Sequence, residues 1–345
     1  MTDYRRAPAE LDDRLRGYVG EVFDCSPDGI TALRRIEAGE RHIVYRVSCG
    51  DEEADRTDLI VRISTGDDPA ERTQAAQEAA VLRRVGGVVG PELYDFQLDS
   101  HWFDAPVMCL EFLPGQHRDL TSATAADLKL LGAVVRRLHD APVGDLAAWF
   151  PDGRDLSAYV EGRAKVEHAK LGSIRDPLPG PVQHRLQGAL LVMNESLDRL
   201  RGLCASAPDK ELVLLHGDIA RGNVLWDAQP VLIDWEYARL GDPADEIAYT
   251  FTQNALIGPQ VNAFWHGYGN SSDDQVGASP LVERVRRWAP VTLMGSVLWW
   301  VDQWSRSDHA GATGLVDPSA PKTPDYYLDQ VLLRLDRFED TFGSG

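Results

Sequence analysis

Two short apolar runs, each followed closely by an aspartate, constrain this chain of 345 residues more than any other feature. The run 212–215 leads to Asp218, the run 230–233 leads directly to Asp234, and Asn223 lies between them. Apolar runs of this length predict buried strands, and polar residues at the ends of strands are well placed for chemistry. Two carboxylates and an amide could hold one magnesium ion and orient one hydroxyl, which is the arrangement that phosphoryl transfer requires.

The residues around these runs match a known family pattern over fixed spacings. The matching positions are His216, Gly217, Asp218, Asn223, Ile233, Asp234, Trp235, Glu236, Gly241, Asp242, Pro243, Ile247 and Ala248. The pattern H-G-D-x-x-x-x-N, I-D-[WF]-E and G-D-P-x-x-D-[LI]-A resembles that of the aminoglycoside phosphotransferase and choline kinase family, which shares the protein-kinase fold. Glu246 stands where the last block usually has Asp and keeps its charge.

This resemblance implies an ATP- and Mg²⁺-dependent phosphotransferase. Its acceptor would be a hydroxyl of a small, polar, amine-bearing molecule, with an aminoglycoside or amino sugar as the first choice. A choline-, ethanolamine- or thiamine-type kinase is the alternative. A catalytically inactive kinase-fold binding module is a hypothesis of another class, and the intact Asp218, Asn223 and Asp234 argue against it.

The resemblance also implies roles for single residues. Asp218 is expected to orient the acceptor hydroxyl and to take its proton late, and Asn223 and Asp234 are expected to bind Mg²⁺. Arg221 is a candidate catalytic residue that would reach the γ-phosphate or an acidic group on the acceptor; an exposed place on the loop is the alternative. Glu236 is a candidate partner for an amine of the acceptor, and structural hydrogen bonding fits it equally well.

The fold expected is α+β, a bilobal protein-kinase-like fold with an N-terminal nucleotide-binding lobe at 1–113. Hydrophobic periodicity predicts a helix at 9–23 and a five-stranded antiparallel sheet. Its strands are expected at 31–37, 42–48, 58–64, 92–98 and 107–113. Pro114 and Gly115 mark the expected boundary to a catalytic and substrate-binding lobe at 114–345.

Several residues of the first lobe are candidates for nucleotide binding. Arg62 occupies the place of the phosphate-binding cation of the family, and Glu78 on a helix at 70–84 is its expected partner. Gly39 lies in a hairpin that would cover the phosphates. The candidates for contact with the base are Glu111, Phe112 and Leu113. Each has an ordinary alternative: a solvated helical glutamate, a plain hairpin turn, or the edge of the sheet.

The second lobe is expected to be mostly helical, with a helical insertion at about 142–210 that covers the acceptor in relatives. Helices are predicted at 124–140, 155–171, 182–203, 244–256, 260–268, 280–304 and 324–342. His139, His216 and Asp242 are expected to be structural. Trp300 and Trp304, four residues apart on one helix, could form an aromatic cage for a quaternary ammonium, although core packing is the more frequent use of such residues.

Composition narrows the range of partners. A net charge of −19 argues against binding to nucleic acid or to an anionic membrane surface. An acidic surface suits a cationic acceptor, and solubility explains it equally well. Four scattered cysteines and a charged N-terminus without a signal-peptide pattern predict a cytoplasmic protein. A monomer or a homodimer is expected.

Overall fold

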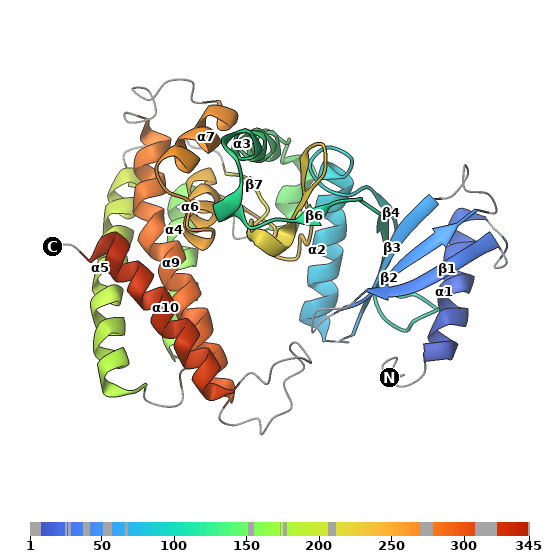
Figure 1. Cartoon of the computed structure of the whole chain (residues 1–345), viewed down its shortest axis with the longest axis horizontal. Helices are drawn as coiled ribbons and strands as arrows, with labels where there is room; N and C mark the ends of the chain where they lie inside the picture. Colours follow the sequence, from blue (N-terminus) through green and yellow to red (C-terminus); the bar gives the residue numbers. More distant parts are fainter. Residues whose placement is uncertain are drawn as a thin grey trace. The chain divides into compact units, whose positions relative to one another are not determined.

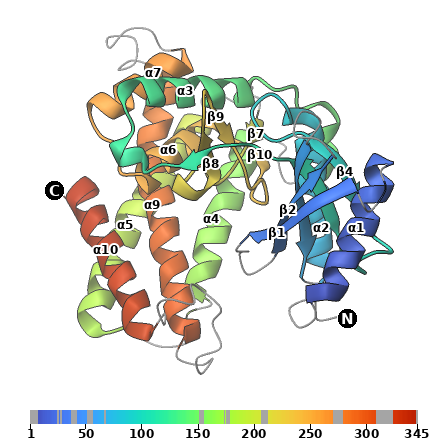
Figure 2. The same cartoon turned by 45° about the vertical axis from the view of Figure 1, so that its right-hand side comes forward.

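The computed structural model describes residues 8–24, 26, 29–36, 42–50, 57–65, 68–150, 155–172, 174, 178–205, 212–269, 279–307 and 323–343. Figures 1 and 2 label its helices and strands. Gly39, predicted to lie over the phosphates, is outside the described residues.

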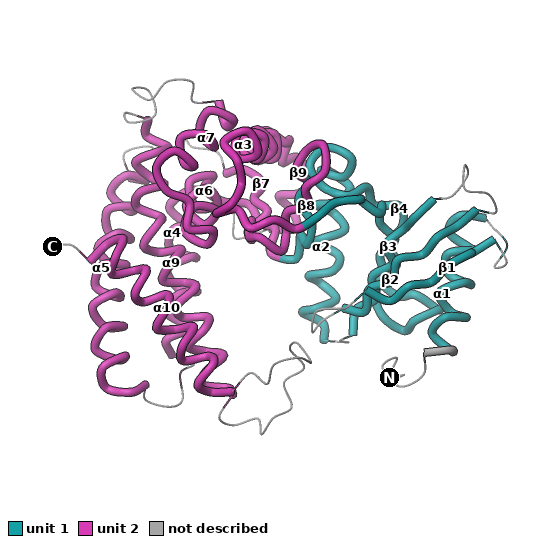
Figure 3. The backbone as a smooth tube through the Cα atoms, in the orientation of Figure 1, with its two compact units in different colours: residues 1–116, 231–236 teal, residues 117–230, 237–345 magenta. Residues whose placement is uncertain are grey.

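The chain divides into two compact units (Figure 3). The first contains Met1–Gln116 and Val231–Glu236, and the second contains His117–Pro230 and Tyr237–Gly345. The sequence places the boundary between 113 and 114, whereas the contacts keep 114–116 in the first unit. They also assign to it a short segment that lies far along the chain and includes Asp234.

The first unit is built on one five-stranded antiparallel sheet, as predicted, and its strand order is β1-β2-β3-β5-β4. Its elements are α1 (Pro8–Phe23), β1 (Ile30–Ile36), β2 (His42–Cys49), β3 (Thr57–Ser64), α2 (Pro69–Val85), β4 (Leu93–Gln97) and β5 (Val107–Glu111). The strand β5 ends two residues earlier than predicted, because its ladder with β3 finishes at the pair of Leu59 and Glu111. The start of α2 follows from Asp68, whose side chain accepts a hydrogen bond from the Ala70 N–H, and from Pro69 at the first helical position.

Strand alternation gives this sheet two different faces. Val61 and Ile63 are fully buried in a cluster that also contains Leu15 and Val19 of α1. Because successive side chains of a strand point to opposite faces, Arg62 points away from this cluster. It meets Glu78 of α2 there.

The second unit is mostly helical. Its helices are α3 (Ala125–His139), α4 (Leu156–Gly172), α5 (Gly180–Ala205), α6 (Pro243–Gln253), α7 (Pro259–Tyr268), α9 (Pro280–Ser307) and α10 (Pro324–Phe342). Helices α4, α5, α6 and α10 all pack against α9, and α3 packs against α7 (Figure 2). The predicted insertion supplies α4 and α5. Among the described residues, no helix is both long and apolar enough to cross a membrane.

Short elements connect the residues of the motifs. Two of these elements lie at the boundaries of the units, and the others lie in the second unit. The short elements are β6 (Gln116–His117), η2 (Leu120–Ser122), η3 (Gly144–Trp149), β7 (Val213–Leu215), η4 (Arg221–Asn223), β8 (Val224–Trp226), β9 (Pro230–Leu232) and β10 (Arg239–Gly241). Strand β7 pairs antiparallel with β10, with Leu215 opposite Arg239. This pairing places the loop that follows β7 beside Tyr237, which precedes β10.

Candidate active site

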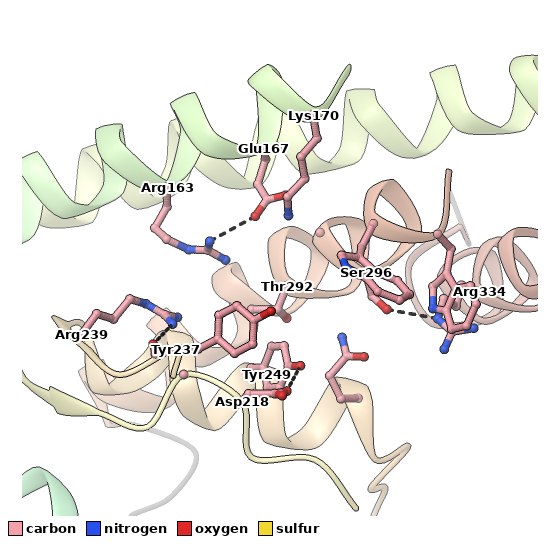
Figure 4. Close-up of a pocket in the computed structure, with 15 residues that line it drawn as sticks. Arg163, Glu167, Lys170, Asp218, Tyr237, Arg239, Tyr249, Thr292, Ser296 and Arg334 are labelled. Atoms are coloured by element: carbon pink, nitrogen blue, oxygen red, sulfur yellow. Dashed lines mark hydrogen bonds and ion pairs between the residues drawn. The ribbon is translucent and has the colours of Figure 1, made fainter. Parts of the chain in front are cut away.

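Asp218 follows β7, and hydrogen bonds fix both of its carboxylate oxygens. The Tyr249 hydroxyl of α6 donates to Oδ1 (Figure 4). The Asn223 side-chain amide donates to Oδ2 at 2.7 Å and to the Asp218 backbone carbonyl at 3.0 Å. Burial, together with the neighbouring Asp218, raises the pKa of Tyr249 well above its usual range, so the phenol stays protonated as a donor. The carboxylate therefore has a defined orientation.

The backbone before Asp218 is fixed in the same way. Gly217 has φ +88°, and a Cβ at this position would lie 2.2 Å from the Tyr237 carbonyl oxygen, so only glycine fits. The Gly217 N–H donates to Glu246 Oε1 at 2.7 Å. The other oxygen of Glu246 lies 2.9 Å from His139 Nε2. Glu246, at the position where the family pattern has Asp, thus anchors the loop from the buried side.

The residues predicted to be structural have structural contacts. His216 is fully buried, and its Nδ1 accepts a hydrogen bond from the Asp218 N–H at 3.3 Å. The Nδ1 of His139 lies 2.7 Å from the Tyr268 hydroxyl. Asp242 caps α6 and pairs with the buried Arg284 at 2.9 Å. These three predictions are confirmed.

Asp218 lines a cavity of about 350 Å³, within the size range of small-molecule sites. The charged residues that line it are Arg163, Glu167, Lys170, Asp218, Arg239 and Arg334. Figure 4 shows the first three along one helix, α4. Because α4 lies in the predicted insertion, the insertion contributes part of the cavity wall.

One ion-pair network holds the α4 side of this wall. The fully buried Asp245 lies 3.2 Å from Arg163 and 3.1 Å from Arg239. Glu167 joins the network through Arg163 at 3.1 Å and Lys170 at 2.7 Å. Burial would raise the pKa of Asp245, but the two guanidinium groups outweigh it and lower the pKa. Asp245 therefore stays ionised and keeps both arginines in place.

The first unit contains a second cluster of predicted site residues. Arg62 is almost fully buried and forms the predicted ion pair with Glu78. Its Nη1 also lies 3.8 Å from Asp234 Oδ1. The second oxygen of Glu78 accepts a hydrogen bond from the Trp235 N–H at 3.2 Å. Burial lowers the pKa of Arg62, and the charge of Glu78 more than reverses this, so the guanidinium stays protonated.

Other predicted residues of the first unit lie around this cluster. Glu236 lines a small cavity with Glu78, and its backbone carbonyl accepts a hydrogen bond from Gln74 at 2.9 Å. At the end of β5, Glu111 accepts a hydrogen bond from the Glu92 N–H at 3.1 Å. The Phe112 ring lies 3.9 Å beneath the guanidinium of Arg46, and Leu113 is partly exposed.

The sequence predicts Arg221, Trp300 and Trp304 as site residues of the second unit, and of these only Trp300 lines the cavity beside Asp218. Arg221 is exposed, lies 3.8 Å from Asp119 and does not line the 350 Å³ cavity. Trp300 lines the cavity, but the guanidinium of Arg334 lies 4.5 Å from the centre of its ring. Trp304 does not line the cavity, because it lies on the buried stripe of α9 that also holds Val301. The two tryptophans therefore do not form a cage around this cavity.

Sequence reasoning missed several residues that the fold brings to the cavity. Tyr249 directly follows the last motif position and lies one helical turn after Asp245. Arg163, Glu167 and Lys170 recur at helical spacing on α4, which predicts one shared polar face but not a place at a cavity. Arg334 carries no such signal.

The family follows from a direct comparison. The model of the phosphotransferase enzyme family matches residues 32–281, well over half of the chain. The chain belongs to this family. Over 114 residues it is 32% identical to thiamine kinase of Escherichia coli, a match that covers 32% of this chain and 40% of that relative. The matched segment thus spans less than half of the relative's length.

Two solved structures share the fold. A choline/ethanolamine kinase family protein from Mesorhizobium loti aligns with a TM-score of 0.60 and 20% identity over 96% of each chain. Spectinomycin phosphotransferase, solved with ADP and spectinomycin, aligns with a TM-score of 0.55 and 16% identity. That alignment covers 90% of this chain and 94% of the other. The predicted protein-kinase-like α+β fold is confirmed.

Proposed function

We propose that this phosphotransferase transfers the γ-phosphate of ATP to a hydroxyl of a small polar molecule bound in the cavity beside Asp218. The observation that carries the proposal is the carboxylate of Asp218. Hydrogen bonds from Tyr249 and Asn223 hold it at the wall of a cavity of small-molecule size. Membership of the phosphotransferase enzyme family supports this type of reaction.

The chemistry proposed for Asp218 follows from its hydrogen bonds. Each carboxylate oxygen has two lone pairs, and the Tyr249 and Asn223 donors occupy one on each oxygen. The remaining lone pairs can accept the hydrogen bond of an acceptor hydroxyl. As the hydroxyl oxygen bonds to the γ-phosphorus, the bond to the β-phosphate oxygen breaks, ADP leaves and Asp218 takes the hydroxyl proton.

Asn223 and Asp234 are the proposed Mg²⁺ ligands, and their atoms fit that ion. Asn223 uses its amide nitrogen toward Asp218, and its Oδ1 makes no hydrogen bond with any described residue. The Asp234 carboxylate is 44% exposed. No group of three or more His, Cys, Asp or Glu in the described ranges could form a protein-only metal cage. Mg²⁺ commonly takes one or two protein oxygens with phosphate and water, and it would neutralise charge on the phosphates.

For the nucleotide, Arg62 is the proposed phosphate-binding residue and Glu78 its positioning partner. The proposed base contacts are Glu111, Phe112 and Leu113. Beyond β5, the N–H groups of Phe112 and Leu113 donate no backbone hydrogen bond to the described residues, so they are open to a ligand. Gly39 and Arg221 stay predicted contacts of the phosphates.

The acceptor is proposed to carry an amine, as an aminoglycoside or amino sugar does. The fold shared with spectinomycin phosphotransferase supports this proposal. The Glu167 carboxylate does not support it, because it is buried and pairs with Arg163 and Lys170. The alternative acceptors are choline, ethanolamine and thiamine, and the exposed Trp299 on the cavity wall favours an acceptor with a flat or quaternary cationic group. The Glu236 carboxylate stays a predicted contact of the amine. A cytoplasmic location is part of the same proposal.

Transfer of labelled γ-phosphate tests the function. The purified chain is incubated with Mg²⁺ and ATP and with one acceptor at a time from three groups: aminoglycosides and amino sugars, choline-type alcohols, and hydroxy acids. Label is expected to appear on an acceptor and to require Mg²⁺, so EDTA should stop it. ATP binding without transfer to any group would contradict the proposal and favour the inactive binding module.

A further inference from the structure

The cavity beside Asp218 has an unexpected charge for this chain. The whole protein carries a net charge of −19. Four basic residues nevertheless line the cavity, against the two carboxylates of Glu167 and Asp218. A cavity that gathers cations in an acidic protein points to an acidic group on its ligand.

Three of these four cations already have carboxylate partners. Arg163 pairs with Asp245 and Glu167, Arg239 pairs with Asp245, and Lys170 pairs with Glu167. These pairs account for the buried acids of the α4 wall. Arg163, Arg239 and Lys170 thus share the two carboxylates of Asp245 and Glu167, which offset most of their charge.

Arg334 of α10 differs from the other three. Its Nε donates to Ser296 Oγ at 3.1 Å, and its Nη1 donates to the Gln330 carbonyl at 3.2 Å and to Gln330 Oε1 at 2.9 Å. Its Nη2 donates no hydrogen bond to a described residue, and no described carboxylate pairs with it. Trp300 lies beneath its plane. Neutral contacts thus hold the guanidinium in a fixed position while leaving its charge unbalanced.

Electrostatics agrees with this geometry. Burial, together with the nearby Arg337, lowers the pKa of Arg334 to about 10, which still leaves it protonated at neutral pH. An anion beside the guanidinium would relieve both effects. Arginine is suited to this role because its planar fork binds carboxylate and phosphate through two parallel hydrogen bonds.

We propose that the acceptor carries an anionic group, a carboxylate or a phosphate, which Arg334 binds while the acceptor hydroxyl lies at Asp218. This inference rests on the proposed kinase function, and it replaces the aminoglycoside- and choline-type acceptors with acidic ones. The acceptor is a hydroxy acid or a phosphorylated alcohol, with or without an amine. A purely cationic acceptor would be repelled by the unbalanced charge of Arg334.

The test compares matched acceptors that differ in one charge. Each hydroxy acid is paired with its primary amide, and each phosphorylated alcohol with its unphosphorylated form. The wild-type protein should prefer the anionic member by about 10- to 100-fold in kcat/KM, as charge-assisted bidentate hydrogen bonds predict. Quenching of tryptophan fluorescence gives a second readout, because Trp299 and Trp300 line the cavity. A larger preference within the hydroxy-acid pairs would identify the anionic group as a carboxylate, and a larger preference within the phosphorylated-alcohol pairs would identify it as a phosphate.

Two variants assign the effect to one residue. Arg334→Gln should reduce the preference to less than about threefold, and Arg334→Lys should restore part of it. Arg337→Gln is the matched control, because Arg337 lies on the same helix and is also partly buried but does not line the cavity. The control should retain the full preference.

The outcomes separate this inference from the proposed function. Equal binding and turnover of anionic and neutral members, including no response to either, overturns the anion site. The anion site is also overturned if Arg334→Gln keeps the wild-type preference for anionic acceptors. Turnover of choline-type or aminoglycoside acceptors alone would overturn the anion site and leave the proposed kinase function standing. Absence of transfer to every class would overturn the kinase function itself.

Discussion

The loop at Asp218 and the cavity wall at Arg334 satisfy their polar groups in opposite ways. In the loop, Glu246 holds the Gly217 N–H, and protein donors occupy both oxygens of Asp218. At the wall, Arg334 is fixed by neutral groups and its charge has no described carboxylate partner. A region whose catalytic carboxylate is oriented by protein donors can serve one reaction for any acceptor. A region with an unbalanced charge can select the acceptor.

The largest expected effect is that of Asp218→Asn. The amide keeps the shape of the side chain but cannot take a proton, so kcat should fall by about 10³-fold for every acceptor. Nucleotide KM and the midpoint of thermal unfolding should stay near wild type. Asp227→Asn, at an exposed aspartate of the same unit, is the control. Retained turnover in Asp218→Asn would remove this residue from the reaction.

Glu246→Ala should disturb the loop that carries Asp218 and leave the cavity wall at Arg334 unchanged. It leaves the partly buried Gly217 N–H and the buried His139 ring without their acceptor, which should cost about 3 kcal/mol in the free energy of unfolding. Urea unfolding measures this loss. The kcat should fall for all acceptors without a change in the preference among them. If Glu246→Ala changed the preference among acceptors and kept the wild-type free energy of unfolding, the loop and the cavity wall would not act independently.

Tyr249→Phe tests the residue that the motifs did not reveal. Loss of the hydroxyl frees Oδ1 of Asp218 to rotate, which should lower kcat by about tenfold and leave the KM of the nucleotide unchanged. Thr252→Ser, on the same helix, is a control for a small change in α6. If Tyr249→Phe raised the acceptor KM at constant kcat, Tyr249 would be a contact of the acceptor instead.

The smallest expected effect is a loss of stability against urea at acid pH. Burial would raise the pKa values of Glu246 and Asp245, but His139, the Gly217 N–H and two arginines lower them below the ordinary values of 4.5 and 3.8. A lowered folded-state pKa contributes stability that is present above the unfolded-state pKa and is lost as pH falls through the folded-state value. The unfolding midpoint in urea should thus begin to fall below about pH 4.5. A flatter profile in Glu246→Gln would assign part of the loss to Glu246, and an unchanged profile would contradict that assignment.

Much of this architecture follows from the sequence. The β-branched and aromatic residues of β2 and β3 and the apolar stripe of α3 predict these elements to within a few residues. The motif residues Asp218 and Asn223, five positions apart, are in hydrogen-bond contact. The cavity wall could not be predicted in this way. Arg163 and Arg334 lie on polar faces of α4 and α10, and sequence alone does not distinguish such a face from one that contacts solvent. Only the packing of both helices against α9 brings these residues to the cavity.

The most direct test of the account is a crystal structure with a non-hydrolysable ATP analogue, Mg²⁺ and a phosphorylatable acceptor. The account predicts the acceptor in the cavity of α4, α9 and α10, with its hydroxyl within about 3 Å of an Asp218 carboxylate oxygen. Its anionic group should contact Arg334. An acceptor bound outside this cavity, or with its hydroxyl beyond hydrogen-bond reach of Asp218, would contradict the proposed mechanism.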